Sequence, residues 1–302
     1  MLNGIIVIDK EPGFTSHDVV AKMRGICGQR KIGHTGTLDP AATGVLPVCL
    51  GSATKLCDML TEKDKEYVAE LLLGVETDTQ DTTGEVLARK PVEVTEEQVR
   101  QAIAGFVGHY DQVPPMYSAL KVNGKKLYEL AREGKEVERK ARPVEILEIE
   151  ILTMDLPVVK IRVACSKGTY IRTLCSDIGA ALGCGGTMQS LRRTKVGGFS
   201  LESALTLGQL QERKDKQELY GIVIPVDSVF SECPALHVLE EHRKLLDNGN
   251  AFYPRQTVEK TKFEAGKWVR VYWQDDTFAG VYAYEETRKW YKPVKMFLEK
   301  ET

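Results

Sequence analysis

Apolar residues recur along the chain in short runs, and most of these runs have the period of β-strands. Residues 4–8 form a β-branched run, and residues 65–74 place Tyr67 on the same face as apolar side chains. Alternate residues of a strand share one face, so these runs predict buried strands. Two further strands are predicted at residues 144–153 and 158–166.

Capping signals predict helices between these strands. Thr15 or Ser16 begins a helix that runs to about residue 26, and Thr95 opens a Thr-Glu-Glu-Gln capping box for a helix to about residue 106. Pro114 and Pro115 make a rigid break in the chain. Further helices are predicted at residues 53–60, 173–182 and 207–220.

From about residue 233 the pattern changes to short strands. Residues 268–272 and 278–284 flank a turn and predict a hairpin, and residues 290–298 predict a last strand. A run of short strands of this length suggests a small β-barrel. We therefore predict two domains, residues 1–232 and 233–302.

The stretch KIGHTGTLDPAATGVLPV, residues 31–48, carries candidate chemistry. Pro40 pushes Asp39 toward an extended conformation, so Asp39 is predicted on a tight loop that a buried strand or helix start anchors. One carboxylate, the His34 imidazole and free backbone N–H groups are typical of an active site, although such glycine-rich loops are also common turns. No third ligand stands at metal spacing, so we expect no metal.

Composition excludes several classes of protein. Of 302 residues, 42% are hydrophobic, which supports a full core, and 41 basic residues face 43 acidic ones. An RNA partner would therefore have to meet local basic patches. Seven cysteines without a CxxC pair favour free thiols in a reducing compartment. We find no signal peptide or membrane span and expect a cytoplasmic protein.

The most basic patch is an insert at residues 118–142. It holds eight basic and four acidic side chains, a local charge of +4 in a chain of net charge −2. It has few apolar residues that could anchor it to a core. The segment is either an ordinary solvated helix-turn or a mobile arm that grips RNA.

Four blocks of sequence together resemble the bacterial tRNA pseudouridine-55 synthase (TruB) family. The blocks are GHTGTLDPAATGVLP, KEYVAELLLGVETDTQDTTG, VPPMYSALKVNGKKLYELAREG and SKGTYIRTLCSDIGAALG, in the order and at the separations of the family. One departure is Glu11, which stands between Lys10 and Pro12, where the family usually has proline directly after lysine. The resemblance also favours the RNA-gripping arm.

This resemblance implies an α+β pseudouridine-synthase fold, with a central mixed, largely antiparallel sheet flanked by helices. The C-terminal part resembles, less sharply, the β-barrel PUA domain of the family, which binds RNA. The implied partner is the T arm of tRNA, modified at uridine 55. The reaction is redox-neutral, so no cofactor is expected, and we expect a monomer without a protein partner.

The resemblance also assigns roles to residues. Asp39 is the catalytic carboxylate, and Arg172 pairs with it and keeps it charged. Tyr67, which alone would be a core tyrosine, lies against the uracil and accepts the C5 proton. The remaining substrate contacts are Tyr170, Leu191 and His34, the last filling the space of the flipped base.

Two other functions remain open at this stage. A non-catalytic RNA-binding or tRNA-folding protein could use the same scaffold, but it would be expected to lack the carboxylate. A glycosidic hydrolase would need a second acid near Asp39, and Asp78 and Asp81 lie in a nearby polar loop.

Overall fold

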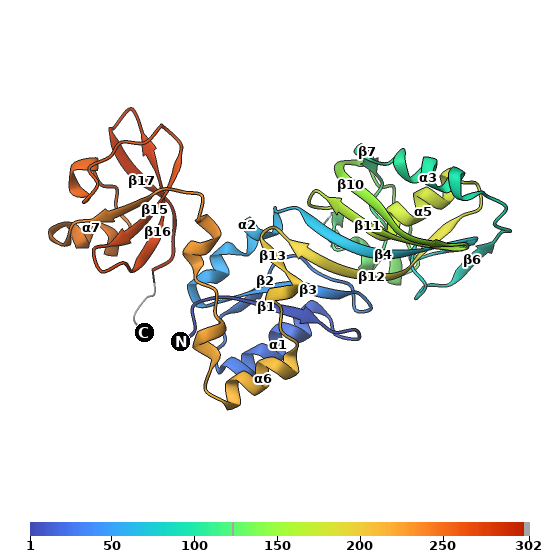
Figure 1. The fold of residues 1–302 in the computed structure, drawn as a ribbon, viewed down its shortest axis with the longest axis horizontal. Coiled ribbons are helices and arrows are strands. Elements are labelled where there is room, and N and C mark those ends of the chain that lie inside the picture. The colour runs from blue at the N-terminus through green and yellow to red at the C-terminus, as the bar shows by residue number, and fades with distance from the viewer. Residues whose placement is uncertain (123, 299–302) are drawn as a thin grey trace.

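A nine-stranded mixed sheet forms the centre of the larger part of the molecule (Figure 1). The computed structural model describes residues 1–122 and 124–298. Residue 123 of the predicted insert and residues 299–302 of the predicted second domain lie outside the described residues. The strands of this sheet are β1 Gly4–Lys10, β2 Ile32–His34, β3 Thr43–Leu50, β4 Lys65–Leu73, β7 Gly108–Gln112, β10 Arg142–Asp155, β11 Val158–Cys165, β12 Gly186–Val196 and β13 Phe199–Ser200.

The order of the strands brings distant segments together. The main path is β1-β3-β12-β4-β11-β10-β7, and its pairs are antiparallel except β12 with β3. Strand β12 therefore lies between β3 and β4. Its Arg193 is opposite Gly44 on one side and Tyr67 on the other. The predicted largely antiparallel mixed sheet is confirmed.

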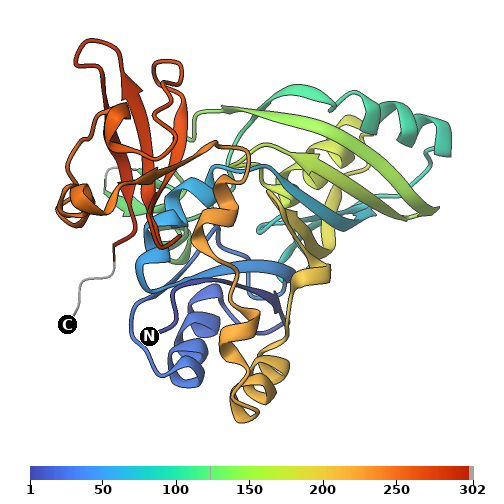
Figure 2. The same ribbon diagram turned by 60° about the vertical axis from the view of Figure 1, so that its left-hand side comes forward.

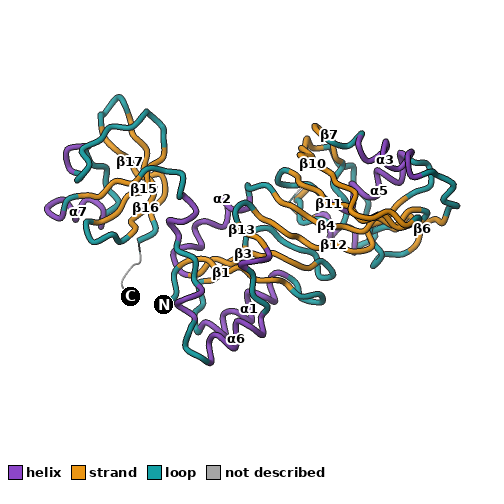
Figure 3. The backbone as a smooth tube through the Cα atoms, in the orientation of Figure 1, coloured by secondary structure: helices purple, strands orange, loops and turns teal. Residues whose placement is uncertain are grey.

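Two pairs of helices cover this sheet at its two ends (Figures 1 and 3). Helices α1 Ser16–Cys27 and α6 Leu207–Asp215 pack against each other and bury apolar residues of β1 and β3. Helices α3 Glu96–Ala104 and α5 Ile171–Ala181 pack over β4, β10 and β11. None of the helices in the described part of the chain is long and apolar enough to cross a membrane.

Most element boundaries match the sequence patterns, with informative exceptions. The helix predicted to residue 220 ends at Asp215, because Gln217 adopts a φ of +62° and Glu218 N–H donates to the Arg213 carbonyl. This pairing satisfies carbonyls at the end of a helix. The helix predicted at residues 53–60 is a 3₁₀-helix, Gly51–Leu56, that continues into α2 Cys57–Thr61.

The predicted insert has secondary structure of its own. It contains the two-residue strands β8 Lys121–Val122 and β9 Lys125–Lys126 and the helix α4 Leu127–Arg132. Leu127 and Leu130 are buried, so the insert has apolar anchors. Nearby, β5 Val75–Thr77 and β6 Val86–Arg89 form a separate hairpin.

The C-terminal part forms its own four-stranded sheet, seen apart from the first in Figure 2. The predicted hairpin is confirmed as β15 with β16. Phe278 and Phe297 pack with Phe230, Leu56 and Ile5, so apolar contacts join the two parts. The elements are β14 Ala235–Val238, α7 Arg243–Asp247, β15 Trp268–Trp273, β16 Phe278–Glu285 and β17 Trp290–Met296.

The contact between α5 and β12 gives a stability prediction. A Cβ on Gly179 would lie 2.2 Å from the backbone nitrogen of Gly186, so Gly179→Ala forces two backbones apart. We expect Gly179→Ala to lower the free energy of unfolding by about 1–3 kcal/mol in urea denaturation.

The matched control is Gly25→Ala in α1, where a Cβ meets no atom within 4 Å. It should raise the free energy of unfolding by up to about 1 kcal/mol, because alanine favours helices. Equal effects at Gly179 and Gly25 would contradict a close helix–strand contact.

Candidate active-site cleft

A cleft of about 1120 Å³ opens where β4, β12, the start of α5, the loop at residues 36–41 and the insert meet. Five of the six residues singled out by sequence line it, including Asp39, Tyr67 and Arg172. The other two are Tyr170 and Leu191. Residues more than 100 positions apart thus share one cavity.

Asp39 and Arg172 form an ion pair, as the sequence led us to expect. The Arg172 Nη2 atom lies 3.3 Å from Asp39 Oδ2, and the same nitrogen donates to the Tyr117 carbonyl at 2.7 Å. The Arg172 side chain is 8% exposed, whereas the Asp39 side chain is 43% exposed. The pair therefore has a buried cation and an accessible carboxylate that a ligand in the cleft could reach.

A second carboxylate, Asp81, contacts the other side of the same guanidinium. Its Oδ2 lies 3.6 Å from Arg172 Nη1. Its Oδ1 accepts hydrogen bonds from the Thr79 hydroxyl and from the backbone N–H and hydroxyl of Thr83. Asp81 is therefore tied down by its own loop, and it holds Arg172 in position for Asp39.

Tyr67 projects from β4 toward Arg193 of β12. Tyr67 and Arg193 stand opposite each other in the strand register, and burial raises the pKa of Tyr67 while the Arg193 charge opposes that rise. Arg193 donates through Nε to the Val45 carbonyl at 2.7 Å and through Nη2 to the Gly36 carbonyl at 3.1 Å. It therefore links Tyr67 to the loop that carries Asp39.

Lys10 also holds the loop that carries Asp39. Its ammonium group donates to the carbonyls of Glu11, Phe14 and Pro40 at 3.1, 2.6 and 3.1 Å. Burial lowers the pKa of Lys10, and the negative charge of Asp39 opposes that shift. Although Glu11 stands between Lys10 and Pro12, the end of β1 is thus hydrogen-bonded through Lys10 to Pro40, the residue after Asp39.

Tyr170 is held through its backbone. The Gln112 side chain accepts from Tyr170 N–H at 2.7 Å and donates to its carbonyl at 3.0 Å. Tyr170 stands at the start of α5, directly before Ile171, so these bonds also help to fix Arg172 in the first turn of the helix. Leu191 lies on β12 and contributes an apolar wall.

His34 is placed differently from the other candidates. It ends β2, and its ring meets His17 of α1 edge to face with centroids 5.2 Å apart. Within the described residues it is not part of the cleft lining, and its buried Nδ1 has no hydrogen-bond partner there. Burial, with His17 and Arg193 nearby, lowers the pKa of His34 to about 4. The imidazole is therefore neutral at pH 7.

The cleft is more basic than the chain as a whole. Its described lining has six basic and three acidic side chains, whereas the chain carries a net charge of −2. Such a local excess attracts an anionic ligand. The basic residues are Lys65, Arg132, Arg142, Lys167, Arg172 and Arg193.

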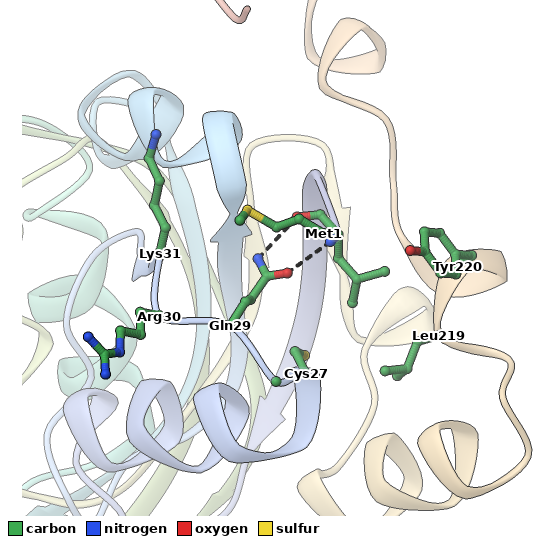
Figure 4. A pocket seen from close by; sticks show the side chains of 9 residues that line it. Met1, Cys27, Gln29, Arg30, Lys31, Leu219 and Tyr220 are labelled. Carbon is green, nitrogen blue, oxygen red and sulfur yellow. Dashed lines mark hydrogen bonds between the residues drawn. The ribbon is translucent and has the colours of Figure 1, made fainter. Parts of the chain in front are cut away.

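A second cavity, of about 670 Å³, lies near the N-terminus (Figure 4). It is formed by Met1, the end of α1 around Cys27, and Leu219 and Tyr220 across from them. None of the residues singled out from the sequence lines it. In residues 1–122 and 124–298, no three His, Cys, Asp or Glu side chains are grouped so as to hold a metal ion.

The sequence analysis gave no role to Gln112 and Arg193, which line the cleft, or to Lys10, which donates to the carbonyl of Pro40 in the cleft lining. In Leu191-Arg192-Arg193-Thr194 the only available signal was strand alternation, which places one of two adjacent arginines on the buried face. Asp81 was considered only as a second acid. Its contact with Arg172 depends on a loop whose path the sequence pattern did not predict.

Comparison with known families identifies the chain as a pseudouridylate synthase. Residues 24–171 match the TruB family pseudouridylate synthase (N terminal domain), and residues 172–231 match the tRNA pseudouridylate synthase B C-terminal domain. The chain belongs to the TruB family, which confirms the resemblance found in its sequence motifs.

Two curated relatives are similar over almost their whole lengths. The tRNA pseudouridine synthase B of Lachnoclostridium phytofermentans is 53% identical over 98% of this chain and 100% of the relative. That of Alkaliphilus oremlandii is 44% identical over 99% of this chain and 100% of the relative. Both matches extend through the C-terminal sheet.

Two solved structures share the fold. An H/ACA RNP bound to a substrate RNA containing 2′-deoxyuridine has a chain that matches with a TM-score of 0.73 and 25% identity. The match covers 99% of this chain and 86% of that one. The archaeal box H/ACA sRNP Nop10-Cbf5 complex matches with a TM-score of 0.72 and 26% identity, over 99% of this chain and 87% of that one.

The low pKa of His34 predicts how stability depends on pH. In the unfolded chain the imidazole titrates near its ordinary value of 6.5, and in the folded protein near 4. Between these values only the unfolded state takes up the proton, so the free energy of unfolding falls as pH drops from 6.5 toward 4. Urea denaturation at pH 7 and pH 5 should show a smaller loss in His34→Gln than in the wild type.

The control is His109→Gln, at an exposed position of β7. It should leave the difference between pH 7 and pH 5 close to that of the wild type. The same pH dependence in His34→Gln and the wild type would contradict a buried, neutral His34.

Proposed function

We propose that the protein isomerises uridine 55 in the T loop of tRNA to pseudouridine, with Asp39 as the catalytic carboxylate. Pseudouridine formation in tRNA follows from the family, whose curated members are named tRNA pseudouridine synthase B. The ion pair of accessible Asp39 with buried Arg172, inside a basic cleft, is the observation that supports Asp39 as the catalytic carboxylate. The enzyme is thus an isomerase.

The chemistry requires one bond to break and another to form at the same carbon. Cleavage of the N1–C1′ bond builds positive charge on the ribose, as in glycoside hydrolysis. Asp39 can stabilise that charge, attack C1′, or take a proton from the ribose. Atoms and electrons balance within the substrate, so the proposal requires no cofactor.

Arg172 and Asp81 prepare Asp39 for this step. The guanidinium has a backbone carbonyl and two carboxylates around it, which restrict its position. A restrained partner keeps the Asp39 carboxylate aimed at the reacting carbon and lowers the cost of orienting it during the reaction. We assign Arg172 the role of orienting the Asp39 carboxylate.

The uracil ring is proposed to lie between Tyr67 and Leu191. The phenol ring of Tyr67 and the Leu191 side chain line the same cleft, and so does Tyr170, which stands directly before α5. A base stacked in folded RNA must leave its stack to enter this cavity, at a cost of a few kcal/mol. We assign His34 to the space that the base vacates, where a neutral, flat ring can stack.

Two features weigh against the alternative functions. A hydrolase with paired carboxylates needs a second acid free to activate water, yet Asp81 Oδ1 already accepts three hydrogen bonds. A purely RNA-binding protein has no use for an accessible Asp39 beside a buried arginine. The hydrolase and the non-catalytic binder are therefore less consistent with this cleft.

The proposal extends to the domains and the partner. Residues 1–232 form the catalytic domain, with the insert at about 118–142 over the T arm, and residues 233–302 form a PUA-like RNA-binding domain. Tyr128 and Arg132 of α4 line the cleft, which supports an insert that contacts the substrate. We propose a monomer that acts in the cytoplasm on tRNA without a protein partner.

Replacing the carboxylate tests the central role. Asp39→Asn is nearly isosteric but can neither attack nor take a proton, so single-turnover formation of pseudouridine in a T-arm stem-loop should fall by more than about 10³-fold. RNA binding should stay within a few-fold. Product can be measured by carbodiimide adducts or by release of tritium from C5, since substrate and product have equal mass.

Asp58→Asn is the control, because Asp58 is exposed on α2 and outside the cleft lining. It should react at the wild-type rate. Turnover by Asp39→Asn at more than a few per cent of the wild-type rate would remove Asp39 from the chemistry.

Removing basic residues tests the insert. Lys121, Lys125 and Lys126 surround the β8–β9 turn. If each contacts a phosphate, replacing all three by alanine should reduce the slope of log K against log salt by about two to three units. Filter binding of tRNA across a salt series measures this slope.

The control replaces Lys22, Lys214 and Lys216 by alanine, on or directly after α1 and α6, away from the cleft lining. An equal change of slope in both triple variants would show that the insert makes no special contact with RNA.

A further inference from the structure

Arg193 is a buried cation without a carboxylate partner in the part of the chain that the structure describes. The residue is 1% exposed, and no ion pair of the described residues includes it. Its hydrogen bonds go to the carbonyls of Val45 and Gly36, and its charge acts on the hydroxyl of Tyr67. Burying a charge without a counter-ion is unfavourable, so a purely structural link could have used a neutral side chain.

Tyr67 is the titratable group that this charge contacts directly. The two residues stand opposite each other across β12 and β4, so the contact is built into the strand register. Other groups that act on Tyr67 are Asp39 from the loop and Cys165 from β11. Lys65 and Lys10 lie near enough to Arg193 to add to the local positive charge.

The kind of group that faces Tyr67 matters for the chemistry. A guanidinium has only donors, so it can offer N–H groups to the Tyr67 oxygen but cannot accept the proton of the phenol. Tyr67 lines the cleft, which leaves the proton free to face a ligand there. Burial raises the pKa of Tyr67, so the group starts as a neutral phenol, and the Arg193 charge favours the phenolate once the proton leaves.

We propose that Arg193 positions Tyr67 and stabilises its phenolate, so that Tyr67 moves two protons in one turnover. The phenol first gives its proton to N1 of the detached uracil. After C5 has bonded to C1′, the phenolate takes the C5 proton, and the C–H electron pair restores the C5–C6 double bond. Tyr67 returns to a phenol, and the net change is one proton moved from C5 to N1.

This inference rests on the proposed function and adds a positioning residue to it. Gly44 supports the assignment, because a Cβ there would lie 2.1 Å from the Arg193 carbonyl oxygen. The close approach of β3 to β12 keeps Arg193 within hydrogen-bonding distance of Gly36 in the Asp39 loop and opposite Tyr67. The same guanidinium thus fixes the distance between the two proposed catalytic groups.

The test compares Arg193→Gln, which keeps a hydrogen-bond donor without charge, with Arg193→Lys, which keeps the charge. The substrate is a T-arm stem-loop with protium or deuterium at C5 of the target uridine. We expect Arg193→Gln to slow single-turnover product formation by about 10²–10⁴-fold. A C5 deuterium isotope effect larger than that of the wild type should appear, because loss of the C5 proton becomes limiting. Arg193→Lys should be slowed less.

Arg192→Gln is the matched control. Arg192 is the neighbouring residue of β12, half-exposed and paired with Asp9 at 2.7 Å, and it does not line the described cleft. It should leave both the rate and the isotope effect unchanged. Thermal unfolding and RNA affinity are measured for all variants, so that a loss of fold is separated from a loss of proton transfer.

A wild-type rate in Arg193→Gln, or a slowed variant without a larger isotope effect, would overturn the proposal while leaving the proposed function intact. If Arg193→Gln does not fold, Arg193→Lys decides. An Arg193→Lys variant that is slowed without a larger C5 isotope effect overturns the proposal. An Arg193→Lys variant that is slowed with a larger C5 isotope effect, or that keeps the wild-type rate because it keeps the charge, supports the proposal. Failure of the wild type to form pseudouridine in the stem-loop would instead refute the proposed function.

Discussion

The insertion of β12 between β3 and β4 is the constraint on which the cleft depends. β3 follows the loop of Asp39, and β4 carries Tyr67, so neither strand alone would bring these groups together. Through β12, Gly44 and Tyr67 both stand opposite Arg193. The contact at Gly44 leaves no room for a side chain, because a Cβ would lie 2.1 Å from a backbone oxygen. Close backbone packing thus sets where the loop sits.

Three buried or nearly buried cations then hold the loop and its partners. Lys10 donates to three carbonyls, Arg193 to two, and Arg172 to one carbonyl and two carboxylates. Backbone carbonyl dipoles replace the water that these charges lose on burial, which makes their burial tolerable. The same charges make the cleft attractive to an anionic polymer, although the chain as a whole is slightly acidic.

The secondary structure could be predicted where a local signal was strong. The capping boxes of α1 and α3 and the alternating pattern of β4 gave correct elements. The start of β12 was not predicted as a strand, because Gly185 and Gly186 weaken a strand signal. Those glycines are needed by the packing of α5, whose Gly179 approaches the backbone of Gly186. β7 was missed, since its residues, Gly-His-Tyr-Asp-Gln, show no alternating apolar pattern and pair with β10 only in the folded sheet.

The amino-acid sequence by itself determined that Asp39 lies on a loop, that Tyr67 belongs to the inward face of β4 and that the insert is basic, because each depends on neighbours in the chain. Its motifs were also sufficient to indicate the family. Only the tertiary structure decided which arginine is buried, since alternation separates Arg192 from Arg193 without saying which face is covered. The contacts of Arg172 with Asp39 and Asp81, and of Arg193 with Tyr67, join residues roughly 90 to 130 positions apart. Local sequence patterns carry no information at that range, because those distances are set by the order and register of the strands.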